Sequence, residues 1–362
     1  MLKSELAKRN LPELFLAPDG KMISTKEEWE KIMRPYWREV ILREEYGRIP
    51  PYVQPEISSE TMYIDFAGKA VWEKVSFTFT YNGKTHTVPT NLIYPADGKK
   101  HAFFIYLNFR PDIPDRYLPV EELLDNGFGM FSVCYNDVST DDGDFTNGLA
   151  GLFQDGERTG TDTGKIVYWS YMASRMMDYL LTRPEADEKV IGVAGHSRLG
   201  KTALLTAALD ERFAFTCSND SGCSGAAISR YPYEKAEQIH QIVDRFPFWF
   251  CPNYFKYVHN EAKMPFDQHC VLSLVAPRYA FIGGAIEDVW ADNDNQFLNC
   301  VASSKAWELY GKGIVCEDRL PVEGDVFTDG EVCFHLRKGK HYHSRTDWLI
   351  YMDAIKKHFK LQ

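Results

Sequence analysis

One eight-residue segment of the chain has residue types that suit two different chemistries. Residues 195–202 read GHSRLGKT, which satisfies the phosphate-binding pattern G-x-x-x-x-G-K-[ST]. The same segment places Ser197 just after the apolar run VIGVA (190–194), where a strand-to-helix turn exposes a nucleophilic serine. A phosphate loop needs free backbone N–H groups and usually has small residues between its glycines, whereas HSRL is bulky. The segment therefore favours a nucleophile, and a nucleotide-binding protein is the alternative from another class.

The other members of a serine-hydrolase site also occur in the chain. A serine becomes a strong nucleophile when a histidine accepts its proton, and a carboxylate must hold that histidine in one tautomer. Ser197, Asp288 and His341 occur in the order serine, acid, histidine that is typical of α/β-hydrolases. The pattern departs from G-x-S-x-G, because position 199 is leucine and the glycine comes at 200.

The choice of acid and base stays open at this point. Asp220 follows the predicted strand after the nucleophile and is the alternative acid, and Asp292 and Glu287 are outside candidates. His343 competes with His341 as the base, or the two form an H-x-H metal pair, but no third ligand is evident nearby. We therefore expect no metal and no other cofactor.

Three further histidines have plainer interpretations. His196 is expected to shape the turn that carries the serine, and His269 and His335 are expected to be structural. None of them is placed among the reacting groups.

Strands and helices alternate through most of the chain, which predicts a mainly parallel sheet with helices on both faces. Two alternating runs on either side of Asn82-Gly83 predict a hairpin, and hence an antiparallel N-terminal edge. The expected strands are 101–109, 130–135, 189–194, 213–219 and 278–285, and the expected helices are 167–181, 201 onwards, about 233–246, 296–310 and 345–359. This pattern is typical of the α/β-hydrolase fold.

Two regions are predicted, a helical N-terminal extension at 1–60 and a catalytic domain at 61–362. The irregular stretch 257–269 is expected to be a surface loop, with a cap over the site as the alternative.

Composition excludes several classes of protein. The formal net charge of −10 argues against nucleic acid as a partner, because such binding needs clustered Lys and Arg. No run of 18 apolar residues predicts a membrane span. The eight cysteines lack zinc or disulfide spacing, and we interpret them as mostly reduced core residues.

The start has no apolar stretch of signal-peptide length, so the chain as given is expected to be cytoplasmic, or secreted or periplasmic if a leader was removed. The sequence contains no indication of an oligomeric state.

Several sequence blocks, taken together, resemble the bacterial branch of the glucuronoyl esterases. These are α/β-hydrolases of a carbohydrate esterase family related to acetyl xylan esterases. The blocks run in order over roughly residues 165–360 and are GHSRLGKTAL (195–204), NDSGCSGAA (219–227), FPFWF (246–250), FDQH (266–269), APR (276–278), EDVWAD (287–292) and GKH (339–341), with Asp347-Trp348 beyond. The resemblance implies a serine esterase acting on a carbohydrate ester, with a glucuronoyl ester favoured and an acetylated sugar as the alternative substrate.

The resemblance also implies roles for individual residues. Ser197 attacks the ester carbonyl, His341 is the general base, and Arg198 stabilises the oxyanion through its backbone N–H and its guanidinium. The family has its acid either where Asp220 lies, usually as glutamate, or where Asp288 lies. Asp288 is preferred here, because Asp220 is one methylene shorter than glutamate. Three residues fall where the family binds the substrate: Lys201, Glu237 and Trp290.

Overall fold

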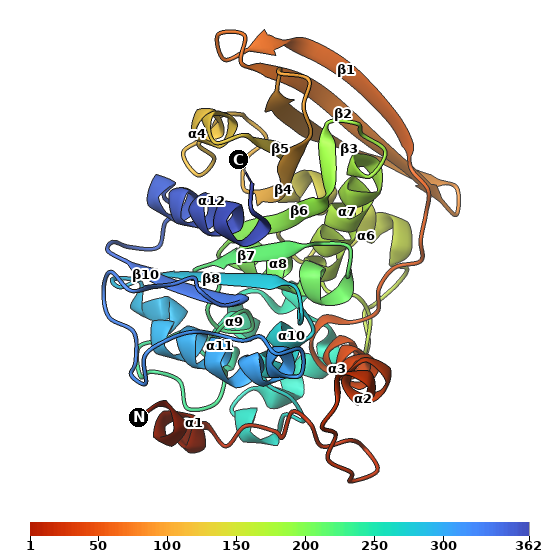
Figure 1. Cartoon of the computed structure of the whole chain (residues 1–362). Helices are drawn as coiled ribbons and strands as arrows, with labels where there is room; N and C mark the ends of the chain where they lie inside the picture. The colour runs from red at the N-terminus through yellow and green to blue at the C-terminus, as the bar shows by residue number, and fades with distance from the viewer. Residues whose placement is uncertain (362) are drawn as a thin grey trace.

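The computed structural model describes residues 1–361, and the side chains of residues 62–65 lie outside the description. The described strands form one mixed sheet in the order β1-β2-β3-β5-β4-β6-β7-β8-β10-β9 (Figure 1). Their bounds are β1 Glu56–Asp65, β2 Ala70–Tyr81, β3 Lys84–Pro95, β4 His101–Asn108, β5 Phe128–Cys134, β6 Ala186–His196, β7 Phe215–Asn219, β8 Tyr279–Ala285, β9 Val326–Phe327 and β10 Val332–Arg337.

The centre of the sheet is parallel and its edges are antiparallel. Neighbouring strands from β5 through β4, β6, β7 and β8 to β10 all pair in parallel. The strands β1, β2 and β3 form an antiparallel edge that joins β5, and β9 pairs antiparallel with β10. Between β2 and β3, Asn82 and Gly83 have φ of 49° and 76°, as a type I′ hairpin turn requires. The predicted α/β-hydrolase architecture is therefore confirmed, including its antiparallel N-terminal edge.

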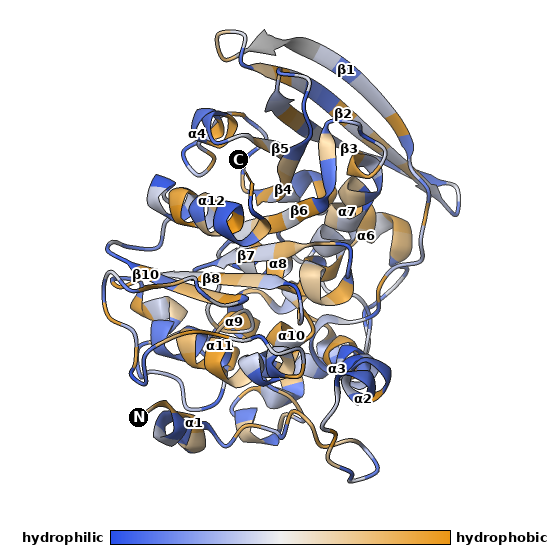
Figure 2. Ribbon diagram, in the orientation of Figure 1, coloured by the Kyte–Doolittle hydropathy of each residue, from blue (hydrophilic) through white to orange (hydrophobic). Residues whose placement is uncertain are grey.

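Helices cover both faces of the sheet. Their bounds are α1 Leu2–Arg9, α2 Lys26–Glu28, α3 Arg34–Ile41, α4 Val120–Asp125, α5 Tyr135–Val138, α6 Gly148–Phe153, α7 Lys165–Leu180, α8 Arg198–Leu209, α9 Ile239–Arg245, α10 Gln268–Ser273, α11 Asn293–Glu308 and α12 Arg345–Phe359. The buried side chains of α4 and α12 form one apolar cluster with the sheet, and those of α3, α7, α8, α10 and α11 form the other. Figure 2 shows β4 and β8 coloured mainly as hydrophobic, as expected of strands buried on both faces.

The N-terminal segment packs against the α/β core. Arg9 in α1 donates to the side-chain oxygen of Asn295 in α11, and Arg34 in α3 donates to the backbone carbonyl of Ala276. Strand β1 begins at Glu56, so residues 56–60, which the sequence placed in the helical segment, belong to the sheet. The division at residue 60 into an extension and a catalytic domain stays a prediction.

The helix α9 and the strand β10 also differ from the sequence-based expectation. The helix expected over about 233–246 is limited to α9, Ile239–Arg245, where Gln238 begins it with a capping box. Strand β10 was not predicted, since His335 and Arg337 interrupt its apolar pattern. Both side chains are buried because each pairs with Asp347 at the start of α12.

The region 257–269 has no long helix or strand, in keeping with the predicted irregular loop. All eight cysteines are free, and seven of them are buried, which fits the core role expected for most of them. None of the described helices is long and apolar enough to cross a membrane.

Candidate active site

Four residues singled out in the sequence lie at one edge of the sheet. Ser197 directly follows β6, and Asp220 directly follows β7. Asp288 comes three residues after the end of β8, and His341 four residues after the end of β10. Because these four strands are parallel and adjacent, their carboxyl ends meet at the same edge, where α/β proteins place their ligand sites.

Ser197 lies on a sharp turn between β6 and α8. Its φ of 59° and ψ of −127° are strained for a residue with a side chain, as in a nucleophile elbow. The backbone N–H of Ser197 donates to the carbonyl of Asn219 at 2.8 Å, which ties the turn to the next strand. A Cβ on Gly195 would lie 2.1 Å from the Leu199 carbonyl oxygen, so the turn closes only around a glycine.

The glycine displaced to position 200 also has a packing role. A Cβ there would lie 2.9 Å from the carbonyl oxygen of Asn219 and 3.1 Å from the Ser221 side chain. Gly200 therefore allows α8 to approach β7 closely, even though the usual glycine position, 199, is leucine.

His341 and Asp288 form a direct hydrogen bond. The Nδ1 atom of His341 lies 2.6 Å from Oδ2 of Asp288, which is the contact that holds a histidine in one tautomer. The Asp288 side chain is buried, whereas the His341 side chain is 43% exposed and remains accessible to a substrate. The His341 ring also lies 4.4 Å, centroid to centroid, from His196, the residue before Ser197.

Asp220 lies beside this pair but makes different contacts. Its Oδ1 atom accepts the backbone N–H of Ala285 at 3.0 Å, and its buried Oδ2 atom has no hydrogen bond to the described residues. Ligand atoms of Asp220, Asp288 and His341 lie within 4.8 Å of one another. Burial, and then repulsion from Asp288 and Asp347, raise the pKa of the Asp220 carboxyl well above its usual range. This environment disfavours the ionised form of Asp220 relative to an exposed aspartate.

The other candidate acids lie outside this arrangement. Asp292 begins α11, where its side chain accepts the backbone N–H groups of Asn295 and Tyr233. Glu287 is exposed, and its backbone N–H donates to the carbonyl of Gly339.

His343 is enclosed by protein. Its Nδ1 atom lies 3.1 Å from the Tyr106 hydroxyl, and its ring stacks on Trp348 at 4.7 Å. Burial lowers the pKa of His343 to about 4. A neutral, buried imidazole packed in this way suits a structural role.

The remaining histidines also make structural contacts. His335 bonds to Asp347 at 2.7 Å, and His269 bonds to the carbonyl of Pro12 at 3.0 Å. His196 is buried beside the turn, and its Nδ1 atom lies 2.7 Å from the side-chain oxygen of Asn219.

Arg198 is the first residue of α8, so its backbone N–H has no acceptor within the helix. Its guanidinium lies 4.8 Å from the centroid of the Trp249 ring and donates to Oδ2 of Asp141. Asp141 also accepts from the Trp249 indole N–H at 2.6 Å and from the Tyr135 hydroxyl at 3.1 Å. The carboxylate thus fixes the arginine and one aromatic wall beside the serine.

Asp141, Trp249 and Tyr135 are functional candidates that the sequence did not reveal. Asp141 lies in the acidic run DDGD (141–144), where nothing distinguishes it from a solvated aspartate, and Trp249 belongs to the quoted block FPFWF. Asp141 and Arg198 are 57 positions apart in the sequence, and only the fold brings them together.

Lys201, Glu237 and Trp290 are connected to one another. The Lys201 ammonium donates to the carbonyls of Ser221 and Cys223 and lies 3.7 Å from a Glu237 carboxylate oxygen. The backbone N–H of Glu237 donates to the Trp290 carbonyl at 3.0 Å. Trp290 follows Asp288 by two positions, so this chain of contacts begins next to the His341–Asp288 pair.

The geometry of GHSRLGKT does not suit a phosphate cradle. The backbone N–H of Ser197 is bonded to the Asn219 carbonyl, and the lysine that would reach the phosphates is buried and bonded to two backbone carbonyls. A phosphate loop needs both groups free to meet its ligand. The nucleotide-binding alternative is therefore wrong for this segment.

Comparisons with known proteins relate the chain to one family. Residues 78–311 match the family model described as "Glucuronyl esterase, fungi". A solved structure of a glucuronoyl esterase from Solibacter usitatus superposes with a TM-score of 0.88 at 30% identity, covering 96% of this chain and 97% of the other.

Two curated relatives are similar over most of the chain. Carbohydrate esterase MZ0003, from an unknown prokaryotic organism, is 27% identical over 98% of this chain and 91% of its own. A 4-O-methyl-glucuronoyl methylesterase from Schizophyllum commune is 28% identical over 83% of this chain and 74% of its own.

Proposed function

The chain belongs to the glucuronoyl esterase family of serine carboxylic-ester hydrolases, and from that premise we propose that it cleaves glucuronoyl esters of xylan with Ser197, His341 and Asp288. The observation that carries the proposal is the 2.6 Å hydrogen bond between His341 and Asp288, at the sheet edge that also holds the strained Ser197 turn. A fixed histidine and a partly exposed serine at one sheet edge are what acyl transfer requires.

The reaction has two stages. His341 accepts the proton of the Ser197 hydroxyl as its oxygen attacks the ester carbonyl, and the Nδ1–H group of His341 donates to Asp288 throughout. His341 then protonates the departing alcohol, which leaves a glucuronoyl ester on Ser197. In the second stage a water molecule, deprotonated by His341, attacks that ester, and His341 returns the proton to the Ser197 oxygen as the free uronate departs.

The oxyanion formed in each stage lies at the N-terminus of α8. The Arg198 backbone N–H is unpaired within the helix, and the helix dipole adds positive potential at this end. The Arg198 guanidinium uses one nitrogen on Asp141, and we assign its remaining donors to the oxyanion.

We assign Asp288, rather than Asp220, as the acid. Asp288 contacts His341 directly, while the pKa of Asp220 is raised by burial and by Asp288 itself, which disfavours a negative charge on Asp220. The Arg337 guanidinium lies 3.6 Å from Oδ2 of Asp220 and gives this carboxyl a charged neighbour other than His341.

Lys201, Glu237 and Trp290 are assigned to the sugar. An ammonium has three donors, and two of those on Lys201 already reach backbone carbonyls, so the third is left for Glu237 and a sugar hydroxyl. Trp290 is half-buried and offers an aromatic surface to the ring of the uronate.

Comparison of two substrates tests the proposed specificity. We expect kcat/KM to be about tenfold or more higher for benzyl glucuronate than for acetate release from an acetylated xylo-oligosaccharide, because the contacts assigned to Lys201, Glu237 and Trp290 bind the sugar ring whose own carboxyl forms the ester. Ser197→Ala is the control and should abolish both reactions. A preference for the acetylated sugar would instead identify an acetyl xylan esterase.

Replacement of Arg198 tests its role in oxyanion stabilisation. Arg198→Ala should lower kcat by about 10²–10³ with little change in KM, since the guanidinium acts mainly on the transition state. Arg198→Lys keeps the positive charge but lacks the planar guanidinium group. Its kcat should therefore lie between that of Arg198→Ala and that of the unmodified enzyme. A normal kcat accompanied by a lower melting temperature would mean that the Arg198–Asp141 pair only holds the turn.

A further inference from the structure

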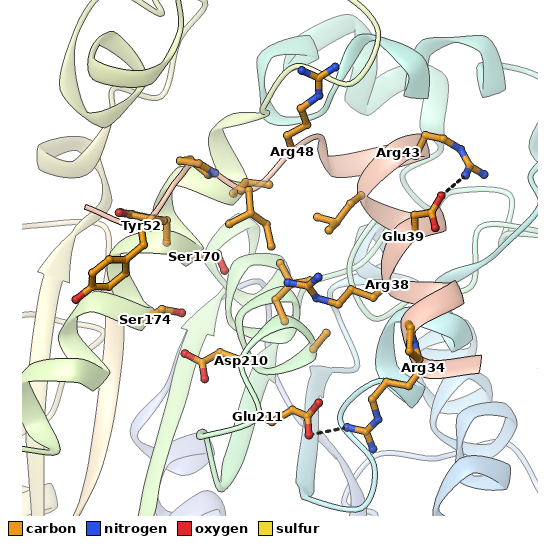
Figure 3. Close-up of a pocket in the computed structure, with 18 of the residues that line it drawn as sticks. Arg34, Arg38, Glu39, Arg43, Arg48, Tyr52, Ser170, Ser174, Asp210 and Glu211 are labelled. Carbon is orange, nitrogen blue, oxygen red and sulfur yellow. Dashed lines mark hydrogen bonds and ion pairs between the residues drawn. The ribbon is translucent and has the colours of Figure 1, made fainter. Parts of the chain in front are cut away.

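A cavity of about 1170 Å³ lies between α3, the segment 48–52, α7 and the C-terminal end of α8 (Figure 3). One side of α7 lines it with Val167, Ser170, Tyr171, Ser174 and Arg175, which share a helical face. Ser197 precedes the first residue of α8, whereas the cavity meets α8 at its last residues, roughly 18 Å away along the helix axis. The cavity is therefore separate from the reacting centre.

Arginines dominate the charged lining of this cavity. Three of them are neutralised by carboxylates that also line it: Arg34 by Glu211 at 3.3 Å, Arg43 by Glu39 at 3.1 Å, and Arg212 by Asp210 at 2.7 Å. The fourth lining carboxylate, Glu30, accepts the Tyr310 hydroxyl.

Two arginines of the lining keep their charge available. Arg38 and Arg48 form no ion pair with the residues that the structure describes, and the Arg48 guanidinium donates among them only to the hydroxyl of Thr161. Figure 3 shows the Arg38 side chain reaching from α3 into the cavity, while Arg34 and Arg43 turn to their carboxylate partners. The cavity thus has the Arg38 guanidinium inside it and the Arg48 guanidinium at its rim, both without a carboxylate partner among the described residues.

A third arginine supports an aromatic surface at the rim. The Arg175 guanidinium lies 4.4 Å from the ring centroid of Tyr52, and its buried Nη1 atom has no hydrogen-bond acceptor among the described residues. Its Nε atom lies 3.2 Å from Asp178, but that carboxylate is shared with Arg212. Tyr52 is 59% exposed, so its outer face is free while its inner face is held over a cation.

These features together select a ligand of one chemical class. Guanidinium groups bind carboxylates through paired, charge-assisted hydrogen bonds, an exposed tyrosine ring packs against the C–H face of a sugar, and the Ser170 and Ser174 hydroxyls suit sugar hydroxyls. We propose that the cavity is a second binding site, which holds a uronate-bearing stretch of the polysaccharide while another stretch occupies the active site. This inference rests on the proposed function, because ester cleavage leaves free uronates on such a chain.

A second site would act through effective concentration. Holding one part of a long chain converts capture of the next ester into an intramolecular step, which lowers KM for a polymer but not for a small ester. Loss of the second site should therefore raise KM for the polymer and leave KM for a small ester unchanged. A defect in the active site would affect both substrates.

Calorimetric titration tests the site with three probes. They are a xylo-oligosaccharide carrying one glucuronate, the neutral xylo-oligosaccharide of the same length, and free glucuronate. We expect the unmodified protein to bind the acidic oligosaccharide at two sites, and Arg38→Ala/Arg48→Ala to bind it at one. In the unmodified protein, the cavity should bind the neutral oligosaccharide at least about tenfold more weakly than the acidic one. Arg319→Ala, an arginine outside the cavity, is the matched control and should keep both sites.

Kinetics provide the second measurement. The double variant should keep kcat/KM on benzyl glucuronate within about twofold and raise KM on polymeric glucuronoxylan by about tenfold. Equal stoichiometry in parent and double variant, or equal affinity for acidic and neutral probes, would overturn the site. Free glucuronate binding as tightly as the oligosaccharide would overturn the polysaccharide as its ligand. If benzyl glucuronate is not hydrolysed at all, the proposed function fails, and the titration still decides the cavity independently.

Discussion

Ser197→Ala should lower kcat on benzyl glucuronate by roughly 10⁴–10⁶-fold, and His341→Ala should lower it to a similar extent, because nucleophile and base act as a unit. Initial rates at saturating substrate, together with the melting temperature, measure the effect. Neither change should prevent folding: Ser197 is anchored by its backbone N–H rather than its hydroxyl, and His341 lies at the surface. The double variant Ser197→Ala/His341→Ala should have a kcat only slightly lower than that of either single variant.

His343 provides the matched control for the base. It lies two residues from His341 but is buried against Trp348, so His343→Gln should keep most of the kcat of the folded enzyme while lowering its melting temperature. Near-normal hydrolysis by Ser197→Ala would show that Ser197 is not the nucleophile. If folded His343→Gln is inactive and His341→Ala is active, His343 is the general base.

Asp288→Asn should lower kcat by about 10⁴, and Asp220→Asn should lower it far less. Asparagine at 288 would favour the wrong tautomer of His341, since its amide N–H₂ can face the Nδ1 atom that now donates to Asp288. At position 220 the change is mild, because that carboxyl accepts from the Ala285 backbone rather than holding His341, its ionised form is already disfavoured, and an amide has a similar shape. Single-turnover rates of both variants on one activated ester check the ranking.

The pair of variants also reveals whether the two carboxylates cooperate. Removing the Asp288 charge relieves one cause of the raised Asp220 pKa, so Asp220 becomes easier to ionise in Asp288→Asn. The double variant Asp220→Asn/Asp288→Asn should then be slower than Asp288→Asn alone. The reverse ranking of the single variants would place the acid at 220, and similar partial losses would mean that the two share the role.

Local patterns were sufficient for the elements that surround the nucleophile. The alternation of apolar runs with helical stretches predicted the parallel sheet, and Asn82-Gly83 predicted the hairpin between β2 and β3, because both signals act between near neighbours in the chain. The same local signals failed for β10, where His335 and Arg337 are buried only because Asp347, ten or more positions away, pairs with both. A charge that is neutralised by a distant residue looks like a surface charge in the sequence.

The sequence by itself determined which residue types follow the sheet strands, and in which order: serine, then two aspartates, then histidine. It did so because a turn needs particular residues at fixed offsets, as at Gly195 and Gly200 around Ser197. Only the tertiary structure brings Asp288, rather than Asp220, into hydrogen-bond contact with His341, because that contact spans 53 positions and is set by strand order and by loop length after β8 and β10. Long-range contacts also gave Arg198 its partner Asp141 and built the arginine-lined cavity from α3, α7 and α8. Periodicity describes which face of an element is buried, and the packing of elements decides what that face meets.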